Sequence, residues 1–265
     1  MCRGRKMGDI WCYLALICPH FVEGTRRNRL DDIMWTKRFC DFLQEKFVTE
    51  DKVKVFKESG YMEQSAHFGW QDKDKALFGL REGYKESADR LLEIALENGN
   101  NIKILDTFIF PIMFLYRHSI EISLKHIYQR AFGKIPDGGH NLLALWDNVK
   151  KDVIDDMICS AEFLAQVKTY KNNFIKYSLD GIKLTEIRAM MKELQEANQR
   201  DKEVDPSVKQ IDQNAEVWRY LMDNDDSLFF SYDHSVDYPQ IKKSMGYIYK
   251  VLDFIYHITD EYLSS

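Results

Sequence analysis

The stretch that decides the fold is residues 108–127, which read FIFPIMFLYRHSIEISLKHI. Its apolar residues recur at intervals of three and four, which predicts a long helix. At 100° per residue, Arg117, Glu121 and Lys125 stand one turn apart on one face of this helix. His118 lies beside them, and large apolar residues border the charged stripe on both sides. The stripe is therefore either a structural ion network or a functional site.

We expect this central helix to begin near Asp106 or Thr107, either of which can cap its N-terminus, and to end near Arg130. Pro111 then falls in the first turn, where its missing N–H breaks no helical hydrogen bond. A helix of roughly 24 residues is about 36 Å long. It is long enough to form the spine of a domain.

Amphipathic patterns on both sides of the central helix predict an all-α bundle. The loop at residues 133–140 is rich in turn formers, and Asn141 can cap the helix that follows it. Residues 196–206 are highly charged and predict an exposed turn, and residues 223–238 predict a loop or a short strand. The other predicted helices are at residues 72–98, 161–176, 184–197, 207–222 and 240–262.

The composition is that of a globular protein with one main domain. Of 265 residues, 45% are hydrophobic and 30% are charged, and only 5 are proline. We expect a helical domain at residues 61–265 and an N-terminal extension at residues 1–60 that can hold short strands. The extension is locally basic and aromatic around Trp35. This composition is typical either of a phosphate-binding surface or of the solvated face of an amphipathic helix.

Charge, cysteines and hydropathy indicate a cytoplasmic protein that does not associate with membranes. The net charge of −5 gives no global attraction to nucleic acid, so RNA binding requires a local basic patch. The 5 cysteines form no CxxC pair, which favours a reducing compartment. The spacing of Cys12, Cys18, His20 and Cys40 matches no common zinc module. No run reaches the roughly 20 apolar residues that span a bilayer.

Common cofactor and catalytic motifs are missing from the sequence. It contains no GxGxxG, GxxxxGK[ST], GxSxG or HExxH motif and no EF-hand loop. These absences argue against dinucleotide enzymes, P-loop NTPases, α/β-hydrolases and the common zinc hydrolases. We therefore expect neither a cofactor nor a metal.

The charged stripe has two interpretations. As exposed pairs at i,i+4 spacing, its salt bridges contribute about 0.2–0.5 kcal/mol each, and as a partly buried network they orient neighbouring helices. As a site, Arg117 holds a phosphate through its planar guanidinium and His118 transfers protons. Lys125 and Glu121 then contribute to substrate binding. The sequence leaves both interpretations open.

Two further histidines are candidates for the same chemistry. His140 follows two glycines beside a predicted helix N-terminus, where backbone N–H groups can hold an anion. A histidine in such a loop is also often a capping or packing residue. His234 follows Tyr232 and Asp233 in the loop before the last helix. Neighbours in sequence do not form a charge relay by adjacency alone, so this second motif is weak by itself.

Four stretches together resemble bacterial HEPN-like proteins. They are GYKESADRLLE at residues 83–93, FPIMFLYRHSIEISLKHI at 110–127, GHNLLALW at 139–146 and DNDDSLFFSYDHSVDYP at 223–239. Proteins of this class often carry a Phe-Leu-Tyr-Arg-His and Leu-Lys helix followed by a Gly-His-Asn/Asp-Leu helix start. The resemblance covers roughly residues 70–263.

This resemblance implies a HEPN-like helical bundle that is frequently a homodimer. It also implies an RNA-acting protein, often a metal-independent ribonuclease of phage defence or of a toxin–antitoxin system with an antitoxin partner. The usual nuclease signature is an arginine, four to six residues and then a histidine, and none of the 7 histidines here completes it. Ser231 also stands where the late motif carries an arginine.

Two hypotheses follow from this departure. In the first, Arg117, His118 and His140 form an alternative RNA-cleaving site, and Lys125, Glu121 and His234 bind the substrate. In the second, the domain is a non-catalytic module that binds a nucleotide or a protein, and the charged stripe is structural.

Overall fold

The computed structural model describes most of the chain after residue 70. The described residues are 71–166, 183–198, 214–220, 226–230 and 232–264, with the single positions 63, 65, 66, 68, 69, 201 and 222. By contacts between residues, the chain divides into two units, Met1–Ala66 and His67–Ser265. The predicted extension at residues 1–60, with its short strands and its cysteines, lies outside the described residues and stays a prediction.

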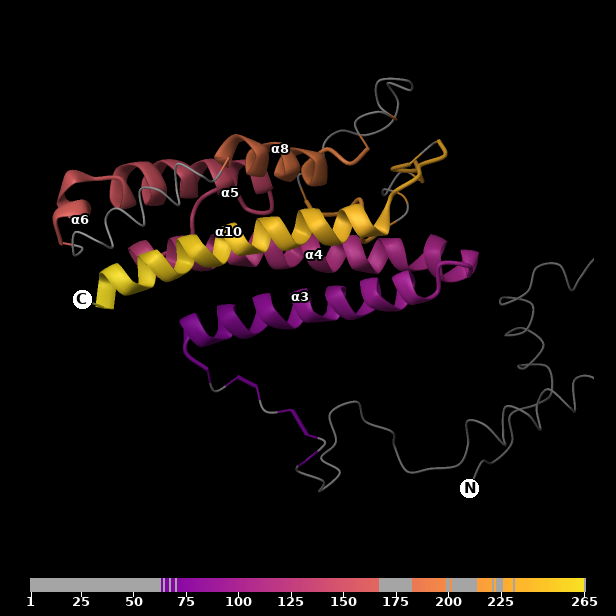
Figure 1. Ribbon diagram of the computed structural model, residues 1–265, viewed down its shortest axis with the longest axis horizontal. Helices are drawn as coiled ribbons and strands as arrows, with labels where there is room; N and C mark the ends of the chain where they lie inside the picture. The colour runs from indigo at the N-terminus through magenta and orange to yellow at the C-terminus, as the bar shows by residue number, and fades with distance from the viewer. Residues whose placement is uncertain are drawn as a thin grey trace, which may run out of the picture. The chain divides into compact units, whose positions relative to one another are not determined.

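The first described helix, α3, runs over Lys73–Glu97 and confirms the prediction for residues 72–98. Asp72 caps it, because its carboxylate accepts the backbone N–H of Lys75 at 2.9 Å. Asn98 closes the other end. A short turn then leads into α4, and the two helices lie side by side (Figure 1).

The central helix, α4, runs over Ile102–Phe132, so the predicted start at Asp106 or Thr107 was wrong. Asn101 is the cap, and its side chain accepts the N–H of Ile104 at 3.3 Å. Pro111 consequently lies in the helix interior, where a proline costs about 3 kcal/mol or more. Ile104, Leu105 and Phe108 pack against the core, and this burial offsets the cost of continuing the helix past the proline.

The segment after the 133–140 loop is helical over most of residues 142–166. Asn141 caps α5, Leu142–Asn148, by accepting the N–H of Ala144 at 3.0 Å, as predicted. The chain continues directly into a π-helix, η3, over Val149–Ile158. A short helix, α6, follows over Ala161–Gln166. The remainder of the helix predicted at residues 161–176 lies outside the described residues.

The helix predicted at residues 184–197 is confirmed as α8, Leu184–Gln195. A turn follows it at residues 196–198, as predicted, but the predicted exposure was wrong where the structure describes residues 196–206, since Asn198 and Asp201 are buried. The prediction of a helix at residues 207–222 was wrong over 214–220, which form turns. Ala215 there has a φ of 61°, which the right-handed helix excludes.

The last helix, α10, runs over Tyr238–Ser264 and confirms the prediction for residues 240–262. Before it, the described residues of 223–238 form a loop, with an isolated antiparallel bridge between Met222 and Leu228. The described part of the chain contains helices and no named strand, which confirms the all-α class for that part.

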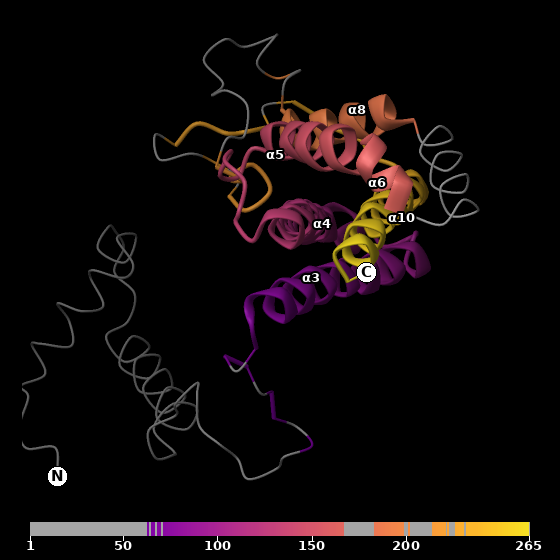
Figure 2. The ribbon, with the colours of Figure 1, turned by 90° about the vertical axis from the view of Figure 1, so that its left-hand side faces the viewer.

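Helix α4 is the spine of the bundle. It contacts α3, α10, α5 and η3, and the view along the bundle places it between α3 on one side and α5 on the other (Figure 2). Most of its residues from Tyr116 to Tyr128 are buried, and its neighbours complete one hydrophobic core. Among the described helices, none is long and apolar enough to cross a membrane. The charged stripe therefore lies on the most enclosed helix of the bundle.

Candidate functional site

The charged stripe of α4 converges with the loop histidine on one carboxylate. Glu121 Oε1 is 2.7 Å from Lys125 Nζ and 2.9 Å from His140 Nδ1. Glu121 Oε2 is 3.6 Å from Arg117 Nη1. Four residues that the sequence singled out separately are thus assembled around the carboxylate of Glu121.

A fifth residue, Gln195 of α8, completes what we term the Glu121 cluster: Arg117, Glu121, Lys125, His140 and Gln195. Its Oε1 accepts the N–H of Leu142 at 2.7 Å and lies 3.5 Å from Arg117 Nη2. The same Arg117 Nη2 donates to the carbonyl oxygen of His140 at 3.0 Å. The cluster therefore ties α4, the N-terminus of α5 and the end of α8 to one another.

The cluster has a buried half and a surface half. Arg117 and Gln195 are fully buried, and the Glu121 side chain is only 2% exposed. The Lys125 side chain is 18% exposed, and that of His140 is 51% exposed. The cluster is thus neither an open cleft nor a closed core. The Glu121 carboxylate is buried, whereas the side chains of Lys125 and His140 reach solvent.

The glycines before His140 set its position. Gly138 has a φ of 120° and Gly139 a φ of 59°, both in the region that favours glycine. A Cβ at Gly138 would also lie 3.0 Å from the Cβ of Ala144. The Gly138 carbonyl accepts the N–H of Asn141 at 2.9 Å. The loop therefore needs glycine at position 138 in order to place His140 next to Glu121.

His118 lies beside the cluster, on the rim of the stripe. Its ring stacks on Phe114 at 5.7 Å between centroids, and it meets the edge of Tyr84 at 4.6 Å. Burial lowers the pKa of His118, and the charges of Glu121, Lys125 and His140 also act on it. The His118 ring is therefore neutral near pH 7, and it lies close enough to the cluster for the cluster's charges to affect its pKa.

His234 belongs to a separate pair. Its Nε2 lies 2.9 Å from Oδ2 of Asp201, whose side chain is fully buried. The backbone N–H of Tyr232 donates to Oδ1 of the same carboxylate at 3.2 Å. The carboxylate that His234 contacts is thus not that of its neighbour Asp233 but that of Asp201, 33 residues away.

Sequence reasoning missed two residues of this arrangement, Gln195 and Asp201. Gln195 ends an amphipathic helix and Asp201 lies in a charged segment, so neither carries a motif. The one available signal for Gln195 is periodicity, because it follows Met191 by one turn on the buried face of α8. No comparable signal identifies Asp201.

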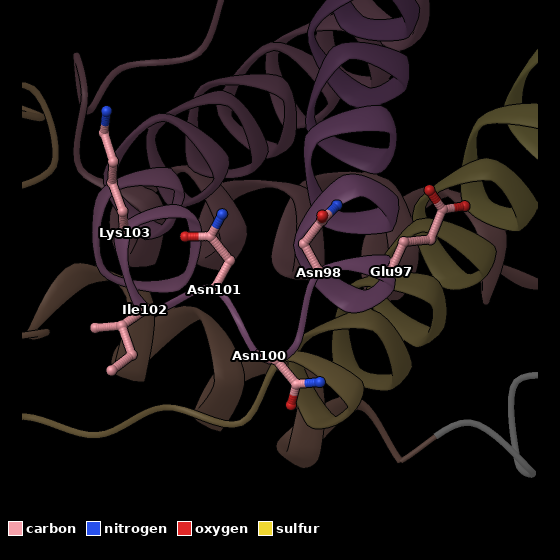
Figure 3. A pocket seen from close by; sticks show the side chains of 6 residues that line it. All are labelled: Glu97, Asn98, Asn100, Asn101, Ile102 and Lys103. Atoms are coloured by element: carbon pink, nitrogen blue, oxygen red, sulfur yellow. The ribbon is translucent and has the colours of Figure 1, made fainter.

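Two open hollows lie elsewhere, near the turn between α3 and α4. The first, of about 600 Å³, is lined by Glu97, Asn98, Asn100, Asn101, Ile102 and Lys103 (Figure 3). Figure 3 shows the side chains of Lys103 and Asn98 pointing to the same side from the two helix ends, with Asn101 between them. The second, of about 580 Å³, is lined by residues of the α3 end and by 235–239. None of the predicted site residues lines either hollow.

Within the described ranges, no three histidine, cysteine, aspartate or glutamate side chains are grouped so that they could hold a metal ion. Comparisons of the chain with protein-family models, with curated proteins and with solved structures found no match.

Proposed function

We propose that the chain is a HEPN-like protein that acts on RNA without metal, with the surface half of the Glu121 cluster as its site. The observation that supports this function best is the pairing of a buried carboxylate, Glu121, with a half-exposed imidazole, His140, at 2.9 Å. The family resemblance adds the RNA substrate, a homodimer and a role in phage defence or a toxin–antitoxin system.

The pair can supply proton transfer. A carboxylate that accepts from Nδ1–H fixes the tautomer of the imidazole and leaves its Nε2 as a base. His140 then takes the proton of an RNA 2′-hydroxyl while that oxygen attacks the adjacent phosphorus. The Arg117 guanidinium donates to the carbonyl oxygen of His140 and so holds its backbone, whereas Glu121 holds its ring. Arg117 is buried, so in this proposal it positions His140 and does not contact the phosphate.

Lys125 supplies the positive charge that the reaction requires. Its ammonium lies 2.7 Å from the Glu121 oxygen that also binds His140, and it reaches the surface. A phosphate that gains charge as the 2′-oxygen attacks is stabilised by such a cation. The 5′-oxygen that leaves the phosphorus needs a proton, and His118 beside the cluster is the candidate donor in its protonated form, which burial disfavours.

Purified protein incubated with RNA in EDTA tests this function. We expect cleavage by the wild-type chain, and a loss of about a hundredfold or more in rate for His140→Ala. His257→Ala is the matched control, since it removes an exposed histidine of α10 and should cleave as the wild type does. Cleavage by His140→Ala at the wild-type rate would remove His140 from the site.

The burial of Arg117 and Glu121 favours a second candidate function. In it the Glu121 cluster is a structural network, and the domain is a non-catalytic module that binds a nucleotide or a partner protein. Buried ion pairs with good hydrogen bonding often serve structure alone. RNA that stays intact after long incubation with the folded wild-type protein would select this candidate over the first.

A further inference from the structure

A second pair of a buried carboxylate and a surface histidine is linked through aromatic rings to the α4 face that carries the Glu121 cluster. Asp201 is fully buried, and the side chain of His234 is 30% exposed. The ring of His234 meets Phe230 at 5.1 Å, and Phe230 in turn meets Trp218 at 5.2 Å. This pair repeats the arrangement of Glu121 and His140.

Trp218 connects this pair to the helix. Its ring lies 6.3 Å from that of Phe110. Phe110 and Glu121 are eleven residues apart on α4, which brings them to the same helical face about 16 Å apart along the axis. The His234 pair is therefore linked to the α4 face that carries Glu121, at a point on the helix whose distance from Glu121 a single RNA strand of a few nucleotides spans.

Arg219 and Tyr220 occupy the interval between the two pairs. The guanidinium of Arg219 lies 6.0 Å from the centroid of Phe114 and 5.0 Å from that of Tyr220. Its Nη2 also donates to the Tyr220 hydroxyl at 2.9 Å. Both residues are exposed, with Tyr220 at 51%. Phe114 stacks on His118, so this interval adjoins the rim of the Glu121 cluster.

We propose that Arg219, Tyr220 and His234 form a second contact region for the RNA strand whose phosphate lies at Lys125 and His140. Arg219 and His234 contact phosphates farther along the strand, and the Tyr220 ring stacks on a base. Stacking requires an unpaired base, so the substrate is single-stranded and longer than the reacting dinucleotide. The inference rests on the proposed function and adds the substrate's form and length to it.

Binding of 2′-O-methyl RNA, which lacks the attacking hydroxyl, tests this contact region. We expect the wild-type protein to bind a single-stranded dodecanucleotide more tightly than a trinucleotide. Tyr220→Ala should weaken dodecanucleotide binding by about fivefold or more, whereas Tyr220→Phe keeps the ring and should bind nearly as the wild type does. Arg219→Ala should lower the salt dependence of binding by about one phosphate contact. Arg90→Ala, which removes an exposed arginine of α3, is the matched control and should change neither quantity.

The experiment distinguishes a failure of this contact region from a failure of the proposed function. If the wild-type protein binds or cleaves RNA but Tyr220→Ala and Arg219→Ala bind the dodecanucleotide as tightly as it does, this contact region is wrong and the proposed function stands. If the wild-type protein neither binds nor cleaves RNA of any length, both are wrong.

Discussion

Helix α4 contributes one member to each of two histidine–carboxylate pairs, and the two pairs are built in opposite ways. In the pair between α3 and α4, His126 is buried at 0% exposure, and the Asp74 carboxylate is solvated at 45%. In the Glu121 cluster, the carboxylate is buried and His140 is at the surface. The nitrogen–oxygen distance is 2.9 Å in both pairs, so distance does not distinguish them.

Of these two pairs, only the pair of Glu121 and His140 presents its histidine to solvent. The ring of His126 packs on Tyr256 at 4.5 Å, and its Nδ1 has no hydrogen-bond partner among the described residues. Burial lowers the pKa of His126, because a proton added there would be poorly solvated. His140 in contrast has a fixed ring and access to solvent. A buried histidine thus serves packing, whereas a buried carboxylate leaves its histidine available.

The largest expected effect comes from removing the buried carboxylate. Glu121→Ala leaves Arg117 buried without its carboxylate, and we expect the free energy of unfolding to fall by about 3–5 kcal/mol. Urea unfolding measures it. Asp74→Ala is the matched control, because it removes the solvated carboxylate of the other pair and should cost only about 1 kcal/mol. Equal losses for the two variants would contradict the comparison.

A smaller effect is expected from the loop that presents His140. Gly138→Ala must place a Cβ at a φ of 120° and 3.0 Å from the Ala144 Cβ, so we expect a loss of about 1–3 kcal/mol in the free energy of unfolding. RNA cleavage should fall with it as His140 moves. Gly139→Ala is the control, since its Cβ meets nothing within 4 Å and its φ of 59° is the milder left-handed conformation. A Gly139→Ala loss as large as that of Gly138→Ala would argue against the close contact with Ala144.

The smallest effect is a pH dependence that belongs to the buried histidine. The pKa of His126 is lowered from its ordinary value of 6.5, so the unfolded chain binds a proton at a higher pH than the folded chain does. Stability is therefore complete above about pH 6.5 and falls as the pH drops toward the lowered pKa, by at most about 1.4 kcal/mol per pH unit. His118 contributes in the same direction, because burial lowers its pKa as well.

Unfolding experiments at pH 7.5 and at lower pH values, in wild type and in His126→Gln, measure this dependence. The variant should be less stable overall but should show a shallower fall as the pH drops. His257→Gln is the control and should keep the wild-type slope. An unchanged slope in His126→Gln would show that His126 is not responsible.

The sequence could predict most of the described helices and could suggest, as one hypothesis, a site that joins the stripe to His140, for identifiable reasons. Helical periodicity placed Arg117, Glu121 and Lys125 on one face of α4. Two glycines followed by His140 and Asn141 predicted a turn that ends at a helix cap, and the structure has both. These signals are local, since each depends on residues within a few positions of one another.

The features that the sequence could not predict depend on long-range contacts. Gln195 meets Leu142 across 53 positions, and Asp201 meets His234 across 33. The true start of α4 was missed because Pro111 is a strong local signal, whereas the packing of Ile104 and Leu105 against the core is not visible locally.

The π-helix η3 affects where the chain can lose a residue without losing its fold. Each of its turns closes from residue i to residue i+5, as in the bond from the Cys159 N–H to the Ile154 carbonyl at 2.9 Å. Such a turn holds one residue more than an α-helical turn does. Deletion of an exposed residue such as Lys151 can therefore convert a turn to α-helix and leave the Glu121 cluster intact. A single-residue deletion at an exposed position of η3 is therefore expected to be tolerated.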